Sequence, residues 1–314
     1  MSNKINISGV EETTGFKTSV KTTKAIGRKL PLSGKKIAIS VSVNEDLEKL
    51  GLSEHHINDI SIEVARYVIS NGGTGIYGGD LRVGGFTEYF SELSAQYMIE
   101  NDRTPRFINY FCFPTSKDLT EAAQISFKKK QIKAQLVPLP IKLRGIDTER
   151  EYQPTAIVED RKIYSESFRN MRQQMAKDTD ARIVLGGKQQ GFLGYIPGVI
   201  EEALLTLQEN KPIYLIGGFG GATAGFISML KGESPEMLSN EVQYNTEFLR
   251  SFREHINVDC PVADYSELKK QITGFSLKKI SELNKLSEVE NEVLFTSKNI
   301  HEILYLLMKG LKSL

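Results

Sequence analysis

Short apolar runs alternate with longer amphipathic segments along this chain from Lys35 onwards. A short apolar run bounded by turn residues is typical of a buried strand, and apolar side chains three and four residues apart are typical of a helix. Ile57, Ile60 and Val64 show the helical spacing. The pattern predicts strands at residues 35–42, 74–79, 106–113, 134–140, 181–187 and 212–218. It predicts helices at residues 53–71, 86–99, 118–132, 165–178, 197–210 and 221–232, with further helix up to residue 255.

Strands that alternate with helices of this length predict an α/β fold with a doubly wound, mostly parallel sheet, which is a Rossmann-like architecture. Near the end of the chain, residues 292–297 have the pattern of one more strand and residues 299–311 that of a helix. We place this strand–helix pair, at about residues 291–314, in the same domain. Because no Pro-rich or Ser-rich linker divides the chain, we predict a single domain over residues 34–314. Residues 1–33 are polar and predict an N-terminal arm.

Three of the predicted strands end in paired glycines. The glycines are Gly78 and Gly79, followed by Gly84 and Gly85; Gly186 and Gly187; and Gly217 and Gly218, followed by Gly220 and Gly221. In a doubly wound sheet, ligands bind beyond the carboxyl ends of the strands, where glycine lets the backbone turn and approach a ligand closely. The amides at the start of the next helix suit a phosphate. One cluster alone fits an ordinary tight turn, but three predict a shared crevice for an anionic ligand.

None of the three clusters is a standard nucleotide fingerprint. The segment "GGKQQGFLG" lacks the Walker pattern, and "GFGGAT" has Thr223 where the dinucleotide motif has its last glycine. No acidic residue stands where a dehydrogenase holds a ribose. The sequence therefore does not favour a redox enzyme with a nicotinamide cofactor.

Polar residues among the glycines are candidates for contacts with such a ligand. Arg82 and Lys188 would neutralise phosphate charge, while Glu88, Glu201 and Glu202 would accept hydrogen bonds from ribose hydroxyl groups. An acidic residue in a first helical turn is also favoured by the helix dipole alone, so this alternative stays open. The other polar candidates, together with two residues of the glycine loops, are Ser42, Asp80, Thr87, Gly198 and Phe219.

The composition and net charge of the chain bear on whether it binds nucleic acid or a membrane. The chain has 314 residues, of which 40% are hydrophobic and 25% charged, with a formal net charge of +1. This balance gives no general attraction to nucleic acid or to an anionic membrane, and the basic run at residues 127–133 fits a solvated helix end. No apolar run approaches the length of a membrane-spanning helix, and the polar first 30 residues do not have the pattern of a secretory signal.

The cysteines and histidines point to the same kind of protein. Only two cysteines are present, Cys112 and Cys260, which favours free thiols in a reducing cytoplasm. None of the four histidines has a partner at metal-ligand spacing, so we expect no metal and no covalent cofactor. The expected ligand is a small molecule of nucleotide type.

The motifs "IYGGDLRVGGFTE", "SFRNMRQQMAKDTDARIVLGG", "PGVIEEAL" and "PIYLIGGFGG" resemble the SLOG superfamily, the Rossmannoid proteins related to DprA and Lonely Guy. Lonely Guy phosphoribohydrolases carry Tyr-Gly-Gly after the second strand and, later, a helix arginine and Pro-Gly-Gly-x-Gly-Thr-x-x-Glu. Gly78 and Gly79 match the first motif, and Gly198 with Glu202 matches the end of the second. Arg172 is the nearest counterpart of the helix arginine. The resemblance implies that Arg172 and Glu202 are the catalytic pair if the chain is a hydrolase.

This chain departs from the hydrolase pattern in several places. Leu185 replaces the proline, Val199 replaces the threonine, and residues 188–196 are inserted between the glycine pair and Glu202. The longer glycine signatures are more similar to SLOG branches that accompany prokaryotic immune effectors. That likeness implies a sensor for a nucleotide-derived signal such as an ADP-ribose species or cyclic nucleotide, acting as a homo-oligomer or with a separately encoded effector or TIR protein. The alternative is a hydrolase that cleaves an N-glycosidic or ribose-phosphate bond.

Overall fold

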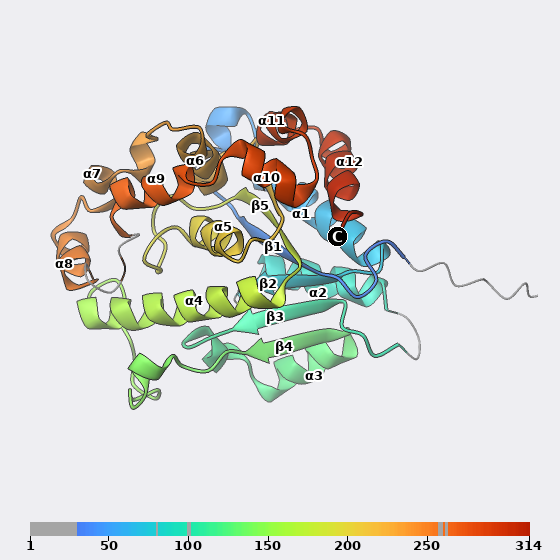
Figure 1. Ribbon diagram of the computed structural model, residues 1–314. Coiled ribbons are helices and arrows are strands. Elements are labelled where there is room, and N and C mark those ends of the chain that lie inside the picture. Colours follow the sequence, from blue (N-terminus) through green and yellow to red (C-terminus); the bar gives the residue numbers. More distant parts are fainter. Residues whose placement is uncertain (1–29, 80, 99–101, 257–259, 261–262) are drawn as a thin grey trace, which may run out of the picture.

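Six parallel strands form one central sheet. The computed structural model describes residues 30–314 except 80, 99–101, 257–259 and 261–262. The strands are β1 (Lys36–Ser42), β2 (Thr74–Gly78), β3 (Phe107–Phe111), β4 (Ile132–Leu136), β5 (Ala181–Gly186) and β6 (Ile213–Ile216). Their order across the sheet is β4-β3-β2-β1-β5-β6, and all neighbouring pairs are parallel (Figure 1). The predicted doubly wound Rossmann-like fold is confirmed.

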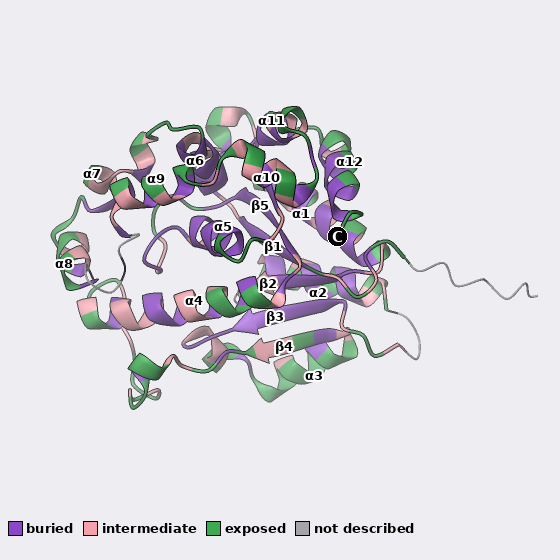
Figure 2. Ribbon diagram, viewed as in Figure 1, coloured by how far each residue is buried: buried purple, intermediate pink, exposed green. Residues whose placement is uncertain are grey.

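Helices cover both faces of the sheet because successive strand residues point to opposite sides. Ile37 and Ile39 pack in one cluster with α1 (Glu54–Ser70), α2 (Phe86–Gln96), α3 (Glu121–Lys129) and α12 (Ile300–Leu311). Ala38 faces the opposite side, against α4 (Val158–Asp178). Further along that side lie α5 (Gly198–Gln208), α6 (Gly221–Leu230), α8 (Glu247–Ile256), α9 (Tyr265–Thr273) and α10 (Leu277–Asn284). Figure 2 shows that α5 is buried along its length.

Short helices and one peripheral helix complete the described chain. They are η1 (Glu48–Leu50), η2 (Thr115–Asp118), η3 (Ile141–Leu143), η4 (Glu236–Leu238), α7 (Asn240–Gln243) and α11 (Glu288–Thr296). No helix within the described residues has the length and apolar character needed to cross a membrane.

The strand order reverses between β1 and β5. The chain builds outwards from β1 to β4, then crosses back through α4 to place β5 on the other side of β1. Ser42 at the end of β1 lies opposite Gly186 at the end of β5. A crevice opens beyond the carboxyl ends of the strands at such a switch point. The fold thus brings the ends of β1, β2 and β5 together at the edge of the sheet where such a crevice is expected.

The strand predicted at residues 292–297 is wrong, because this segment belongs to α11. A capping box starts the helix: Ser287 Oγ accepts from the amide of Glu290, and Glu290 Oε2 accepts from the amide of Ser287, at 3.2 and 2.9 Å. Asn291, Leu294 and Phe295 are buried at helical spacing. The helix covers the edge strand β6, where the Gly217 amide donates to the Leu294 carbonyl. The predicted C-terminal strand–helix pair is therefore a helix pair.

The predicted polar arm lies almost wholly outside the described residues, which begin at Leu30. Leu32 has no exposed surface, and its amide donates to the Asn71 carbonyl at 2.9 Å. The crossover helix α4 also differs from the prediction: it begins at Val158, whereas the apolar pattern predicted a start at Ser165, so the helix is longer than predicted.

We expect both cysteines to resist thiol reagents in the folded protein. Cys112 and Cys260 are free and buried, and burial raises the pKa of each thiol to about 12 although Arg172 and Arg169, respectively, oppose the rise. At pH 8, a shift of this size lowers the thiolate fraction about 1000-fold, and the thiolate is the reactive form. Ellman's reagent should therefore find two reactive thiols only after denaturation. Reaction of either thiol in the native protein at the denatured rate would contradict the packing described here.

Candidate ligand-binding site

A cavity of about 360 Å³ lies at the switch point, between the ends of β1, β2 and β5 and the helices α4 and α5. Clefts of this size are in the range that holds small-molecule ligands. Eight predicted site residues line it: Ser42, Gly78, Gly79, Arg82, Arg172, Lys188, Gly198 and Glu202. The loop after β2, with Gly78 and Gly79, and the loop after β5, with Lys188, therefore meet in one hollow.

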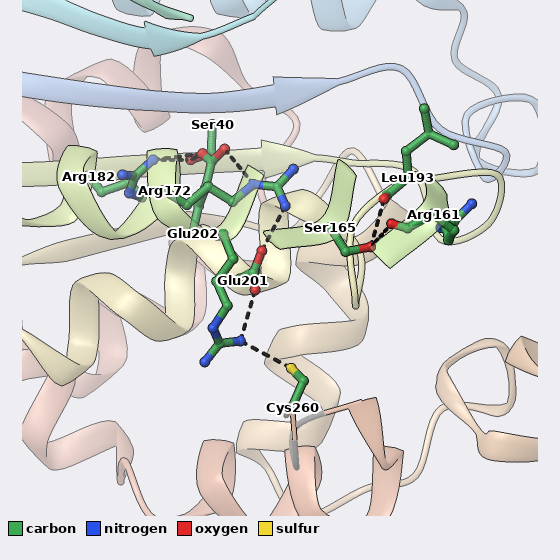
Figure 3. A network of polar contacts seen from close by, with 10 residues as sticks. Ser40, Arg161, Ser165, Arg172, Arg182, Leu193, Glu201, Glu202 and Cys260 are labelled. Carbon is green, nitrogen blue, oxygen red and sulfur yellow. Dashed lines mark hydrogen bonds and ion pairs between the residues drawn. The ribbon is translucent and has the colours of Figure 1, made fainter. Parts of the chain in front are cut away.

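The floor of the cavity is a buried ionic network around Glu202 (Figure 3). Glu202 Oε2 accepts from Arg182 NH1 at 2.7 Å and from Ser40 Oγ at 2.5 Å, and Arg182 NH1 also donates to Ser40 at 2.8 Å. Arg172 Nε lies 3.6 Å from the other oxygen, Oε1. Glu202 keeps only 7% of its surface exposed, and Arg182 none. Hydrogen bonds to charged groups of this kind fix the carboxylate in place.

Glu201 forms a second set of ion pairs next to the Glu202 network, with Arg172 and Arg169. It is 1% exposed, accepts from Arg172 NH1 at 2.7 Å and from Arg169 NH1 at 3.0 Å, and does not line the cavity. Three guanidinium groups, of Arg169, Arg172 and Arg182, thus face two carboxylates, which leaves an excess of one positive charge. An excess cation near a cavity favours an anionic ligand.

The pKa shifts reflect the same balance. Burial lowers the pKa of Arg182, and Glu202 only partly opposes this. Burial also acts to lower the pKa of Arg172, but its pairs with Glu201 and Glu202 outweigh that effect and raise the pKa above the usual arginine value. Arginine stays protonated in either case. The floor therefore carries its positive charge throughout the physiological pH range.

Two glycines let the Arg172 guanidinium approach the backbone of the cavity wall closely. A Cβ added at Gly198 would come 2.5 Å from Arg172 NH2, and one at Gly194 would come 2.8 Å from NH1. Gly198 is the first residue of α5, so the start of this helix stands beside the arginine. Gly198, the glycine of the sequence motif, is thus needed to make room for the Arg172 side chain, whether or not a ligand also approaches it.

We expect Gly198→Ala to lower the free energy of unfolding by about 1–3 kcal/mol, because overpacking a well-filled site forces its neighbours to move. The displaced group is Arg172, so Gly198→Ala combined with Arg172→Ala should cost less than the sum of the two single changes. Urea denaturation of the four proteins measures this coupling. Strict additivity would show that the two residues do not compete for space.

The rim of the cavity carries two more basic side chains. Arg82 and Lys188 line the cavity and also an adjoining hollow of about 490 Å³, which includes the predicted Gly84 and Gly85. The amide of Lys188 donates to Ser42 Oγ at 3.0 Å, which ties the loop after β5 to the end of β1. Both basic residues are exposed and stand where a ligand would enter.

Gly186 and Gly187 support the site without lining the cavity. Their φ angles are +60° and +97°, values that favour glycine. The Gly187 amide donates to the Ser42 carbonyl at 2.8 Å, and a Cβ at Gly186 would come 2.6 Å from that same oxygen. This glycine pair turns the chain away from β5 and holds the start of the loop that carries Lys188.

The third glycine cluster lies apart from the cavity. None of Gly217, Gly218, Phe219, Gly220 and Gly221 lines it. At the start of α6, the Gly221 amide donates to Asp46 Oδ2 at 2.9 Å and the Ala222 amide donates to the Gly187 carbonyl at 2.8 Å. A carboxylate of the chain itself thus occupies the anion position at this helix start. The predicted crevice is formed by two glycine loops, not three.

The remaining predicted residues contact the chain rather than the cavity. Glu88 Oε2 accepts from the Gly84 amide at 2.6 Å and is exposed, so it caps the start of α2. Thr87 is buried, and its Oγ1 accepts from Asn109 at 3.4 Å. Asp80 lies outside the described residues.

Several lining residues were missed in the sequence. Ser40 lies at the floor, and Tyr77, Phe168 and Phe192 contribute aromatic rings to the walls. Arg182 was missed as well; it does not line the cavity but donates to Ser40 and Glu202, which do. A signal existed for Arg182, because a charged residue inside the apolar strand "ARIVLGG" must find a buried partner. Within the described residues, no group of three or more His, Cys, Asp or Glu side chains is arranged to hold a metal ion.

Comparison with known proteins finds one family. Residues 31–294 match the family described as SLOG cluster2. No curated protein and no solved structure matches the chain. The match spans most of the chain and includes every residue that lines the cavity. Membership of this family suggests that the ligand is related to nucleotides. The chain belongs to the SLOG cluster2 family.

Proposed function

We propose that the cavity at the switch point binds a nucleotide-derived small molecule, such as an ADP-ribose species or a cyclic nucleotide. The observation that carries the proposal is the excess positive charge of Arg169, Arg172 and Arg182 over the buried Glu201 and Glu202, beneath a glycine-lined cavity. Arg82 and Lys188 add positive charge at its entrance. Such a site suits phosphate groups, which arginine binds with two parallel hydrogen bonds.

The other lining residues suit the rest of a nucleotide. Tyr77, Phe168 and Phe192 offer aromatic faces for a base. Glu202 and Ser40 lie at the floor and would accept hydrogen bonds from ribose hydroxyl groups. Charge, aromatic surface and hydroxyl acceptors thus occur together in a single hollow.

In this proposal the protein is the sensor of a bacterial anti-phage or stress system, and the nucleotide-derived molecule is its second messenger. The protein acts in the cytoplasm as a homo-oligomer or with a separately encoded effector or TIR protein, without a membrane or nucleic-acid partner. The support is the family membership and the cavity together. A ligand that fills the cavity between α4, α5 and the sheet would change how these layers pack, which gives binding a route to an output.

Calorimetric titration with linear and cyclic ADP-ribose, AMP and NAD tests the binding proposal. We expect at least one of them to bind with one-to-one stoichiometry and to raise the melting temperature, since a ligand selective for the folded state stabilises it. The absence of binding by all four at millimolar concentration would refute the proposal.

A second candidate function is hydrolysis of the bond between base and ribose. It is favoured by one observation: Arg172 and Glu202 line the same cavity and lie within 3.6 Å of each other, despite the insertion at residues 188–196. Glu202, held by Arg182 and Ser40, would stabilise positive charge on the ribose while water adds its hydroxyl to the sugar and its proton leaves with the base. Free-base release from AMP, with Glu202→Gln as control, tests it. Equal release by both proteins would exclude this role for Glu202.

A further inference from the structure

A second cavity, of about 520 Å³, lies on the other side of the loop that carries Gly191 and Phe192, which line both cavities. Its walls are aromatic: Phe192, Tyr195, Tyr244, Phe248, Phe252 and Tyr265 all line it. Tyr195 and Phe252 stack with ring centroids 6.2 Å apart, and Tyr244 and Tyr265 meet edge to face at 6.1 Å. An apolar, aromatic cavity with a few polar groups is typical of a ligand site.

One cation lines this cavity with no compensating carboxylate among the residues that the structure describes. Arg161 at the start of α4 is only 6% exposed, and its NH2 group donates to the Phe192 carbonyl. Its Nε has no hydrogen-bond partner, and no described carboxylate pairs with it. Figure 3 shows Arg161 beside Leu193, apart from the arginines that Glu201 and Glu202 hold. Burying an uncompensated charge is costly, so this one needs an explanation.

A second unsatisfied donor lines the same cavity. Among the described residues, the Tyr265 hydroxyl has no hydrogen-bond partner although the residue is 3% exposed. The Arg161 guanidinium lies 5.4 Å from the ring of Phe252 and 5.9 Å from that of Phe192, so the cation is surrounded by aromatic faces. Unpaired buried donors cost free energy unless a ligand or water satisfies them.

We propose that this cavity is a second binding site, which takes a small planar aromatic anion. The ring lies among the aromatic walls, and the acidic group pairs with Arg161 and accepts from Tyr265. This chemistry has two sources: a free aromatic acid, or an extended ligand from the first cavity whose aromatic ring and a nearby phosphate group reach past Phe192. The site stands on its own residues, so it does not depend on the nucleotide proposal.

The fluorescent dye 8-anilinonaphthalene-1-sulfonate is a suitable probe, because it is aromatic and anionic, and N-phenyl-1-naphthylamine is its neutral counterpart. We expect saturable one-to-one binding of the anionic dye to the native protein. Arg161→Gln should weaken it about 10–100-fold, the value of a charge-assisted hydrogen bond, and leave the neutral dye within about threefold. Because no described carboxylate pairs with Arg161, this change should not lower the melting temperature. Tyr265→Phe should weaken the anionic dye less than Arg161→Gln.

Equal binding of the anionic dye to native protein and Arg161→Gln, or no saturable binding, would overturn the proposal. Competition separates the two sources: displacement by ADP-ribose or NAD but not by AMP supports an extended ligand, and displacement by none of them supports a free aromatic acid. Displacement by AMP alone would show that the two cavities are not separate sites, and would also overturn the proposal. If no nucleotide binds while the dye still does, only the function proposed for the first cavity fails.

Discussion

Replacing Arg182 with methionine should lower the free energy of unfolding by about 3–5 kcal/mol, the largest stability loss we expect from a single change in the site. Arg182 has no exposed surface and donates to Thr206 at 2.7 Å as well as to Ser40 and Glu202. When Arg182 is removed, the only arginine left beside the buried Glu202 carboxylate is Arg172, whose Nε lies 3.6 Å from Glu202 Oε1. Urea denaturation followed by far-ultraviolet circular dichroism measures the loss, since the chain contains no tryptophan.

Two further proteins make this test specific. Lys270→Met removes an ion pair to Glu267 in which the lysine side chain is 75% exposed, and it should change stability by less than about 0.5 kcal/mol. Arg182→Met combined with Glu202→Met should recover most of the loss, because apolar groups often replace a whole buried pair without cost. A loss below about 1 kcal/mol for Arg182→Met, or no recovery in the double variant, would show that the network does not hold the floor together.

The fold could be predicted because its determinants are local. Strands buried on both faces are largely apolar, and the helices between them carry an apolar stripe, so the alternation along the chain is visible in the sequence. Reliance on the local apolar pattern also explains the wrong strand prediction at residues 292–297, around Leu294. The short apolar run of this segment fits a strand, and the capping box from Ser287 to Glu290 decides for a helix.

The candidate site could be predicted only in part, because its geometry depends on contacts between distant residues. Gly78 and Gly198 were found from their motifs, and both line the cavity. Gly221 has the same local pattern, but Asp46, from the loop after β1, fills the start of its helix. Arg182 and Ser40 meet only through the pairing of β1 with β5, which no local pattern contains. Whether a glycine lines the cavity or only forms a turn therefore depends on contacts with residues far away in the sequence.

Arg172→Gln should weaken binding of the nucleotide ligand about 10–100-fold while the protein stays folded. Arg172 lines the cavity and is shared between the two buried glutamates, each of which keeps one arginine when Arg172 is replaced. Glu201 retains Arg169 at 3.0 Å, and Glu202 retains Arg182 at 2.7 Å. The change removes the excess positive charge, because two arginines then face two carboxylates. Calorimetry with ADP-ribose or AMP, whichever binds the native protein, measures the effect.

Arg169→Gln is the matched control. It lies on the same helix, removes the same charge and also leaves Glu201 with one arginine, but Arg169 does not line the cavity. We expect it to weaken binding less than about threefold, since only the long-range part of the charge is lost. If the two variants weaken binding equally, Arg172 acts through net charge and does not touch the ligand. If neither does, the ligand lies elsewhere, and the cavity at the switch point is not its site.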